Sequence, residues 1–509
     1  MISNPLWLLP LLMALPLLAA ILCGLLRSFR WLAGLSSLFA LLQLAVVLMM
    51  LRAVQSLGSE GVLRYTLGGW GAPLGIDLVV DGLAVILLLI TAVLVLFLSL
   101  YSSQYFSNGA SAGRFWPLWW LLVAGLNAAF MAADAFNIYV ALEMIGLSAA
   151  ALVGLAGTRT ALTAALRYAL VGLLGSLCYL LGIALLYRVY GTLDLAQLAA
   201  SVQINPATWA SLSLVTVGLL LKTALLPLHF WLPPAHASAP APVSAVLSAL
   251  VVKASFYLLA RFWLDVLSPA TTEVAMNFLG VLGAVAIVWG CVKAFRTSRL
   301  KLLVAYSTVA QLGYLFLLFP LAAAYGSSSA LGSSSALGSS AMIAVVFFIV
   351  AHALAKAAMF LAAGNIQNYF GHDEIDRVQG VARLQPVAVF TFAIAGVSLI
   401  GLPPSGGFIA KWLLLNTAIQ SGQWWWVVIM LLGGLLAALY VGRVVAVAFS
   451  QMPSVQMNTG AARPVSRSQS WSGLVLALAA VLLGFNTDWL MGLLGPEAAV
   501  SATVAGGWQ

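Results

Sequence analysis

Five ionisable side chains lie well inside long apolar runs of this sequence, where charges are rare. They are Glu143, Lys222, Lys253, Lys356 and Lys411. An ionised side chain at the bilayer centre costs on the order of 2.5 to 3.5 kcal/mol on insertion scales, so the five together oppose insertion by roughly 12 to 18 kcal/mol. Burial also lowers the pKa of a lysine amine, and a drop of about 3 units corresponds to about 4 kcal/mol. The pattern therefore predicts lysines that gain and lose protons near neutral pH.

Lys222 has apolar sequence on both sides. The segment ASLSLVTVGLLL precedes it and TALLPLHFWLPP follows it. Because a regular helix rises about 1.5 Å per residue, its ammonium cannot easily reach either membrane surface, and we expect it to face protein or water. The alternative, a lysine that extends to the interface or only packs, stays open for a lone lysine near a helix end.

Prolines and glycines interrupt two of the apolar runs close to a lysine. The interrupting residues are Pro227 and Pro233 in the first run, and Pro403, Pro404 and Gly406 in the second. Proline lacks a backbone donor and obstructs the preceding turn, and open backbone at membrane depth is tolerated only against protein or a water-filled cavity. We therefore predict broken helices near 221–234 and 401–411. Paired interruptions of this kind indicate an ion site in a transporter built from inverted repeats.

Two further relations connect buried groups with these lysines. A buried carboxylate favours an opposite charge nearby, so we hypothesise that Glu143 pairs with Lys222 and that proton movement strengthens or releases the pair. His352 and Lys356 stand four residues apart and share one helix face. This spacing suits a proton relay, and a hydrogen-bonded packing histidine is the alternative.

Three other polar residues are each open to two interpretations. His229 and His236 are seven residues apart across a proline-rich stretch, which is a poor spacing for a metal site. They either hold the broken helix or guide protons. Asp134 precedes the fifth apolar run, where it either lies at the interface or collects cations or protons at the surface.

Motifs for redox or hydrolytic chemistry are absent from the sequence. No Walker A or GxGxxG element occurs in a strand-to-helix context, and Cys23, Cys178 and Cys291 form no CxxC or Cys/His cluster. We expect no cofactor, no metal and no catalytic site in this chain, which leaves open a place in a proton-translocating oxidoreductase. The net charge of +9 is spread over short loops, so we expect no nucleic-acid partner.

The composition places these groups in an all-α integral membrane protein. Of 509 residues, 63% are hydrophobic and 7% are charged, and the mean hydropathy is +1.08, which leaves too few polar residues to cover a soluble surface. Runs of 18 or more apolar residues can each cross a hydrocarbon core of roughly 30 Å. We count about fourteen, near 4–26, 31–50, 78–100, 115–133, 135–157, 165–187, 208–230, 240–264, 274–294, 302–324, 341–367, 386–420, 424–448 and 470–494.

Basic residues at the ends of these runs predict the orientation. Fourteen fall on one side: Arg27, Arg30, Arg114, Arg159, Arg167, Lys293, Arg296, Arg299, Lys301, Arg377, Arg383, Arg443, Arg463 and Arg467. Four fall on the other side: Arg52, Arg64, Arg188 and Arg261. Because basic residues are retained in the cytoplasm, both termini of this multi-pass chain are expected on the non-cytoplasmic side of the cell (inner) membrane.

Six stretches, in this order, give the chain a specific resemblance. They are DAFNIYVALE, LLYRVYGTLDLAQLA, LKTALLPLHFWLPPAHASAPAPVSAVLSALVVKASFYLLARF, KLLVAYSTVAQLGY, HALAKAAMFLAAGNI and GLPPSGGFIAKW. Over about 75–450 the chain resembles the antiporter-like proton-translocating family, which includes three membrane subunits of respiratory complex I and the large subunits of Mrp-type antiporters. The first two stretches look closest to the D-type subunits of the Mrp antiporters and to the quinone-side subunit of complex I.

The resemblance implies a role for each buried group. Glu143 matches the glutamate of the family's fifth helix, Lys222 the lysine of the broken seventh, Lys253 the central lysine of the eighth, and Lys411 the ionisable residue of the broken twelfth. Lys356 and His352 match the relay of the second half. Pro234 and Arg299 depart from positions that are often acidic in the family, which puts local gating in doubt.

The implied fold has fourteen helices and two inverted five-helix repeats. Residues 1–114 would be helices 1–3, 115–264 the first repeat with helices 4–8, 265–448 the second repeat with helices 9–13, and 449–509 helix 14 and the tail. The repeated tract GSSSALGSSSALGSS at 326–340 is expected to be a loop outside the membrane.

The implied function is that of a proton-translocating subunit in a multisubunit membrane complex. The first hypothesis is an Mrp-type antiporter that exchanges Na⁺ or K⁺ for protons. The alternatives are the membrane arm of a NADH:quinone oxidoreductase or membrane-bound hydrogenase, and a subunit of an inorganic-carbon uptake complex. In each case the partners are other membrane subunits, the lipid bilayer and the transported ions, and the sequence does not identify the coupled ion.

Overall fold

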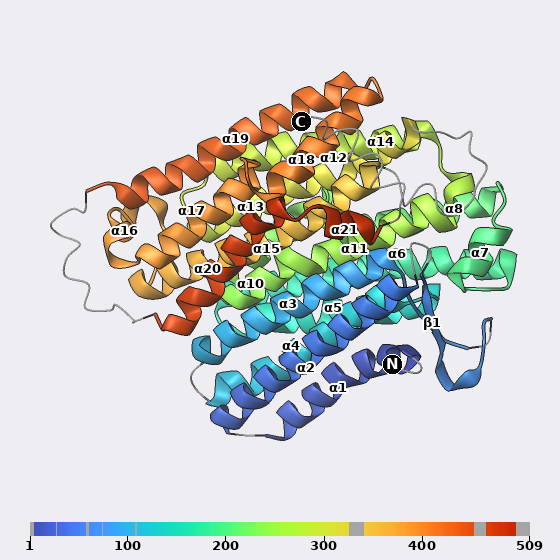
Figure 1. Cartoon of the computed structure of the whole chain (residues 1–509), viewed down its shortest axis with the longest axis horizontal. Helices are drawn as coiled ribbons and strands as arrows, with labels where there is room; N and C mark the ends of the chain where they lie inside the picture. Colours follow the sequence, from blue (N-terminus) through green and yellow to red (C-terminus); the bar gives the residue numbers. More distant parts are fainter. Residues whose placement is uncertain are drawn as a thin grey trace.

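Long helices that run roughly side by side make up most of the molecule (Figure 1). The computed structural model describes residues 5–26, 28–57, 61–73, 75–106, 109–324, 340–451 and 465–494. Arg27, Arg463 and most of the 326–340 tract lie outside the described residues, so the expectations for them stay predictions.

The long helices fall at the predicted apolar runs, and three of the short helices lie between runs. In the N-terminal half they are α1 (Leu8–Leu25), α2 (Phe29–Ser56), α3 (Gly82–Tyr105), α4 (Gly109–Met131), α5 (Ala135–Gly154), α6 (Arg159–Tyr190), α7 (Leu195–Ser201), α8 (Pro206–Thr223), α9 (Leu232–Ser238), α10 (Ala241–Val246) and α11 (Val252–Arg261). In the C-terminal half they are α12 (Glu273–Arg296), α13 (Leu300–Phe316), α14 (Leu318–Ala324), α15 (Ser340–Phe370), α16 (Val381–Leu384), α17 (Pro386–Ile400), α18 (Gly406–Gln420), α19 (Trp424–Phe449), α20 (Arg467–Leu482) and α21 (Asp488–Gly492).

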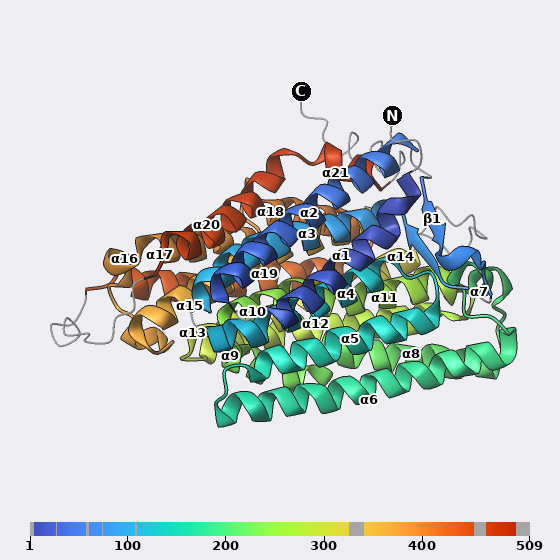
Figure 2. The same ribbon diagram turned by 90° about the horizontal axis from the view of Figure 1, so that it is seen from below.

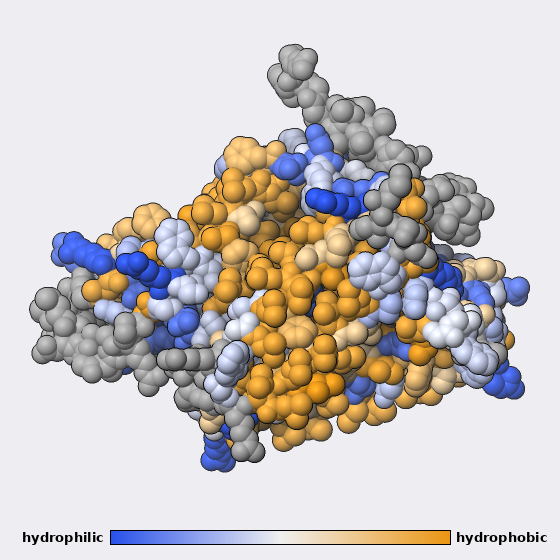
Figure 3. All heavy atoms as spheres, turned by 60° about the horizontal axis from the view of Figure 1, so that its bottom comes forward, coloured by the Kyte–Doolittle hydropathy of each residue, from blue (hydrophilic) through white to orange (hydrophobic). Residues whose placement is uncertain are grey.

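Length and hydropathy confirm a multi-pass membrane protein. Among the described residues, 12 helical segments are long and apolar enough to cross a membrane. Each of the fourteen predicted runs contains helix. Two of the runs are not among these 12 segments: one holds α4, and the other holds the interrupted pair α17 and α18. On the face drawn in Figure 3, a broad apolar band separates two more polar ends. Exposed leucines on α6, such as Leu166 and Leu177, are suited to contact lipid.

Short polar residues determine where several helices begin. Asp81 caps α3 by accepting a hydrogen bond from Ala84 N at 2.8 Å, and Asp134 caps α5 by accepting one from Asn137 N at 2.9 Å. Such caps satisfy backbone donors that the first turn leaves unpaired. Capping therefore accounts for Asp134 at the interface, the first of its two interpretations.

The centre of the molecule is formed by α15. Every residue of its 18-residue apolar window is buried, and α15 packs against α10, α13, α17, α18 and α20. By contrast α6 lies along one edge, as Figure 2 shows. His352 and Lys356 are therefore carried by a helix whose apolar window is fully enclosed.

A small β-hairpin was not expected from the sequence. Strands β1 (Leu63–Thr66) and β2 (Asp77–Val80) pair antiparallel between α2 and α3, with Thr66 opposite Asp77. Arg64 joins the hairpin to the connection before α7 through ion pairs with Asp77 at 2.5 Å and Asp194 at 2.8 Å. Because two four-residue strands carry little periodicity, this stretch reads as a loop in sequence. We call the end of the molecule that carries this hairpin the hairpin side.

Candidate functional site

Glu143 and Lys222 form the predicted ion pair. Glu143 lies on α5 and Lys222 in the last turn of α8, and their Oε1 and Nζ atoms are 3.7 Å apart. The Lys222 side chain is 7% exposed and that of Glu143 is 23% exposed, so the lysine is the more deeply buried partner. Ser176 on α6 donates a hydrogen bond to Glu143 Oε1. Three helices thus meet at one buried charge pair.

Close packing of α6 against α8 brings this pair together. Gly175 and Gly218 face each other, and a Cβ added at Gly218 would lie 2.5 Å from the carbonyl oxygen of Gly175. A Cβ at Gly175 would lie 3.4 Å from Cγ of Lys222. Larger residues would separate the helices and withdraw Lys222 from Glu143, so the glycines are part of the site.

The first predicted break lies directly after Lys222. Helix α8 ends at Thr223, and Ala224 adopts a left-handed conformation with φ 58°. The indole of Trp231 donates to the carbonyl of Leu221 at 2.9 Å, which satisfies one acceptor that the broken helix leaves free. The ammonium of Lys222 also donates a hydrogen bond to the carbonyl of Leu142 on α5 at 3.5 Å.

The second predicted break separates α17 from α18. Helix α17 ends at Ile400, Gly401 is left-handed with φ 86°, and α18 starts at Gly406. Lys411 on α18 reaches back across the break and donates to the carbonyls of Leu399 and Ile400, both at 2.9 Å. Its Nζ also lies 4.7 Å from the ring centroid of Tyr314, a cation–π arrangement.

The helix-breaking residues occupy different places within the two interruptions. Pro227 lies in the break after α8, whereas Pro233 belongs to the first turn of α9, where a missing N–H costs little. Pro403 and Pro404 lie in the turn between α17 and α18, and Gly406 opens α18. Both segments are broken as predicted.

Lys253 and Lys356 lie deeper than the two break lysines. Lys253 on α11 is 1% exposed and donates to Ser248 O at 2.5 Å across a π-helical turn (Leu247–Val251). Lys356 on α15 is 0% exposed and donates to Val304 O at 3.0 Å and to the hydroxyl of Ser307. Neutral oxygens satisfy both amines, so either protonation state keeps at least one hydrogen bond.

Two buried histidines lie near these lysines. His236 is 0% exposed and stacks on Phe360, with ring centroids 4.9 Å apart. His352 is 4% exposed, and among the described residues neither imidazole has a hydrogen-bond partner on either nitrogen. The charges of Lys253 and Lys356 act on both rings. Because both nitrogens of each ring are unpaired within the described structure, each imidazole can still accept or donate a proton.

The other accessory histidine is less central. His229 lies in the short 3-10 turn between Pro227 and α9, is partly exposed, and has no partner for Nδ1 within the described part of the chain. In the residues that the structure describes, no group of three His, Cys, Asp or Glu side chains converges on a common point. The described residues thus give several separate buried titratable groups and no metal cluster.

Lys301 was missed as a candidate in the sequence, where it counted only toward orientation. It starts α13, is 2% exposed, and donates to the carbonyl of Ala239 just after α9. Its charge acts on His236, together with those of Lys253 and Lys356. No local signal distinguishes it from an interfacial lysine, because the contact that buries it is made by a residue 62 positions away.

Comparison with known proteins relates this arrangement to membrane transport. A family described as NADH:quinone oxidoreductase/Mrp antiporter, TM, matches residues 132–437. The NADH-quinone oxidoreductase subunit N of Desulforudis audaxviator is 34% identical over 409 residues, which are 79% of this chain and 78% of the relative. The Na(+)/H(+) antiporter D-type subunit of Bacillus subtilis is 27% identical over 467 residues, 89% of this chain and 90% of the relative.

A solved structure extends the similarity to nearly the full length. A chain of the membrane-bound sulfane sulfur reductase, an archaeal respiratory membrane complex, matches with a TM-score of 0.85 and 26% identity. The match covers 98% of this chain and 99% of the other. The helical architecture described above is therefore that of subunits found in multisubunit membrane complexes.

Proposed function

The chain belongs to the NADH:quinone oxidoreductase/Mrp antiporter transmembrane family, and we propose that it translocates protons as one subunit of a multisubunit membrane complex. Protons would move along the buried groups described above. These groups are Glu143, Lys222, Lys253, His352, Lys356 and Lys411, with Lys301 and His236 beside them. Moving one charge across the membrane is worth about 2.3 kcal/mol per 100 mV, and closely spaced titratable groups divide that work into small steps.

The Glu143–Lys222 pair carries this proposal. A buried ion pair is costly to assemble and is no efficient source of stability, yet here three helices and a helix break converge on it. A proton that arrives at Glu143 removes the opposite charge from Lys222, which changes the free energy of the ammonium. The pair can therefore couple proton uptake at one group to proton release at its neighbour.

Exchange of Na⁺ or K⁺ for protons is the first candidate for the complex as a whole. It is supported by similarity to a Na(+)/H(+) antiporter protein over 89% of this chain. Energy coupling to a redox reaction is the second candidate, supported by the 34% identity to a quinone oxidoreductase subunit. Both assign proton transfer to this chain and differ only in the partner subunits.

Two features of the architecture belong to the same proposal. The segments 115–264 and 265–448 would be inverted repeats, which is supported by the ends of α8 and α17, because each ends in a left-handed residue beside a lysine. Both termini would lie on the non-cytoplasmic side of the inner membrane, which is supported by the distribution of basic residues. If a reporter that works only in the cytoplasm gives a signal when it is fused to either terminus, this orientation is wrong.

The deciding experiment is purification of the intact complex, identification of its subunits and reconstitution into proteoliposomes with an internal pH dye. Proton movement driven by a Na⁺ or K⁺ gradient, without redox subunits, supports the antiporter. Proton movement only after an electron donor and quinone are added, with iron–sulfur subunits present, supports the redox enzyme. If neither condition moves protons in an intact complex, the proposed function is wrong.

A further inference from the structure

Helix α11 carries a stripe of polar side chains that begins at the buried centre. Lys253, Tyr257 and Arg261 follow each other at intervals of four residues within the helix, and Asp265 continues the spacing in the next turn. Residues four apart lie on the same helix face, with a rise of about 6 Å per interval. The stripe therefore runs from the middle of the molecule to the hairpin side.

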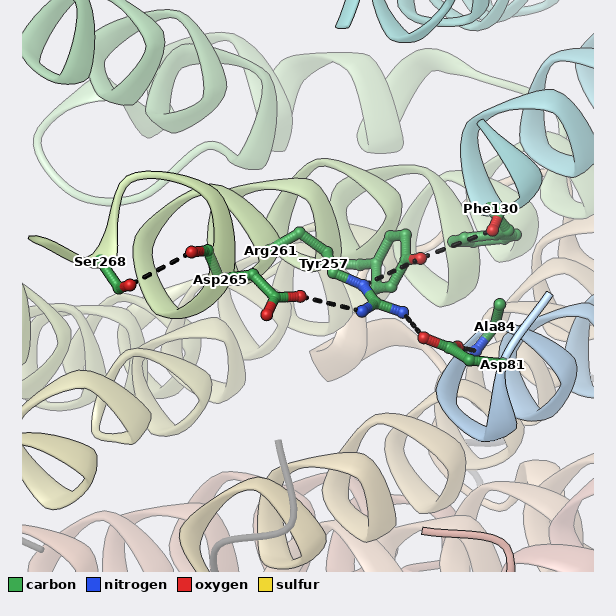
Figure 4. Close-up of polar contacts among 7 residues, drawn as sticks. All are labelled: Asp81, Ala84, Phe130, Tyr257, Arg261, Asp265 and Ser268. Carbon is green, nitrogen blue, oxygen red and sulfur yellow. Dashed lines mark hydrogen bonds and ion pairs between the residues drawn. The ribbon is translucent and has the colours of Figure 1, made fainter. Parts of the chain in front are cut away.

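Arg261 is held by two carboxylates at the outer end of this stripe (Figure 4). It forms an ion pair with Asp81, the cap of α3, and a second with Asp265, whose Oδ2 lies 3.1 Å from Nη1. Burial alone would raise the pKa of the Asp81 carboxyl, but Arg261 holds it below the usual value. We call these three residues the Arg261 cluster. It joins α3 to the end of α11.

Tyr257 connects the Arg261 cluster with the interior. Its hydroxyl accepts a hydrogen bond from Arg261 Nε at 3.3 Å and donates one to the carbonyl of Phe130 at 3.5 Å, as Figure 4 shows. The exposed fraction increases along the stripe. It is 1% for the whole residue at Lys253 and 7% at Tyr257. The side chains of Arg261 and Asp265 are 15% and 27% exposed. The stripe thus leads outward without reversal.

The backbone of this segment is irregular at both ends of the stripe. A π-helical turn precedes Lys253 and leaves the Ser248 carbonyl to accept from its Nζ. A second π-helical turn, Phe262–Val266, contains Asp265. Such turns are rare and concentrate at functional sites. Their placement sets the stripe apart from an ordinary surface of charged residues.

From these contacts, and resting on the proposed function, we infer that the stripe is a proton path between Lys253 and the hairpin side, with the Arg261 cluster as its gate. The guanidinium cannot give up its proton, so while both carboxylates hold it in place it interrupts the series of groups that can pass a proton on. Protonation of Asp265 neutralises one carboxylate and weakens that hold.

After one proton has passed along this path, every group is back in its starting protonation state. Asp265 releases its proton and returns to carboxylate, Tyr257 accepts a proton on its oxygen while its own hydroxyl proton leaves, and Lys253 becomes an ammonium. The hydroxyl both donates and accepts. The interval of about 6 Å from Tyr257 to Lys253 is within reach of one bridging water, whereas the two intervals from Asp265 to Tyr257, about 12 Å together, pass Arg261 and need a chain of waters. Lys253 then passes a proton to the next buried group, which restores its neutral amine.

The test is proton flux through the intact complex in proteoliposomes, with Tyr257→Phe compared with Tyr101→Phe. Both substitutions remove one buried hydroxyl and keep the ring. Tyr101 lies on α3, donates to Asn365 Oδ1 at 2.9 Å and is not on the stripe. We expect Tyr257→Phe to lower flux on the order of 100-fold, as the loss of a positioned proton-transfer group does, while Tyr101→Phe leaves it unchanged.

The outcomes separate this inference from the proposed function. If Lys253→Ala is inactive and Tyr257→Phe is fully active, the path is wrong and the proposed function stands. If Lys253→Ala keeps full flux, the path is wrong and Lys253 is not one of the proton-carrying groups, while proton translocation by the chain stands. An equal loss in the two tyrosine variants also overturns the path, because the effect is then one of packing.

A second measurement tests the gate separately from the path. Arg261→Gln removes the fixed charge, so we expect passive proton leak under an imposed membrane potential to rise above that of the unmodified complex. Adding Tyr257→Phe to Arg261→Gln should return the leak to its original level. A leak that persists in the double variant would show that the protons bypass Tyr257.

Discussion

The two broken helices hold their lysines in the same kind of place by different routes. Lys222 belongs to the helix that ends: it lies in the last turn of α8, and its ammonium donates to the carbonyl of Leu142 on α5 at 3.5 Å. Lys411 belongs to the helix that starts again, and it reaches back to the last carbonyls of α17. In both halves an ammonium beside a helix break donates to backbone carbonyls, although the lysine comes from opposite sides of the break and only Lys411 contacts the end of a broken helix.

The difference between the halves is the counter-charge. Lys222 has a carboxylate within 3.7 Å, whereas the ammonium of Lys411 contacts two carbonyls and the face of Tyr314. A carboxylate can be neutralised by a proton, but carbonyl and ring dipoles cannot. The first site can therefore be changed by a proton on a neighbouring group, while the second changes only when Lys411 itself is protonated or deprotonated.

Removing the charge pair should have the largest effect. We expect Lys222→Ala or Glu143→Ala to abolish proton transport, on the order of 100-fold or more, without preventing assembly, because each removes one member of the coupled pair. Proton flux and the amount of assembled complex are measured together. Full residual transport in either variant would contradict a role for the pair. Ser213→Ala is a control, since this hydroxyl on α8 contacts only the carbonyl of Trp209 among the described residues.

Removing the lysine of the second half should also stop transport, with a different rescue pattern. We expect Lys411→Ala to lose flux and Lys411→Arg to regain part of it, because a guanidinium can still donate to the two carbonyls but cannot release a proton. Flux at saturating driving force reports the difference. If Lys411→Arg is as active as the unmodified chain, then Lys411 supplies a fixed charge and relays no proton.

Neutralising the carboxylate alone sharpens the comparison. Glu143→Gln keeps the size of the side chain and can still accept from Ser176, but it removes the charge that faces Lys222. We expect pH-dependent infrared difference spectra to lose the carboxyl signal and to show an altered lysine signal. Spectra unchanged by this substitution would indicate that the pair takes no part in proton exchange.

Much of the candidate site was visible in the sequence because burial and helix breaking leave local signals. Charges in apolar runs identified Lys222 and Lys411, and prolines and glycines located both interruptions. The pairing of Glu143 with Lys222 was inferred because a buried carboxylate favours an opposite charge nearby. The class of protein followed from composition and from the long apolar runs.

What sequence reasoning missed depends on contacts between distant segments. Nothing near Lys301 indicates that Ala239 buries it, and nothing in GLPPSGGFIAKW shows that Lys411 turns back toward Leu399. The hairpin also depends on pairing of two segments that carry too few residues for a clear period. Such features are set by packing, which a local pattern cannot report.

The smallest expected effect concerns the aromatic face that only the second site possesses. Tyr314→Leu removes the ring under Lys411, and a cation–π contact away from water contributes about 2 kcal/mol. Part of this stabilisation remains because both carbonyl hydrogen bonds stay, so we expect a loss of about fivefold to thirtyfold in flux. Tyr314→Phe keeps the ring and loses only the bond to Met430 O, and it should transport nearly normally. Equal losses in the two variants would assign the effect to the hydroxyl, and the charge on Lys411 would then be stabilised by the end of α17 alone.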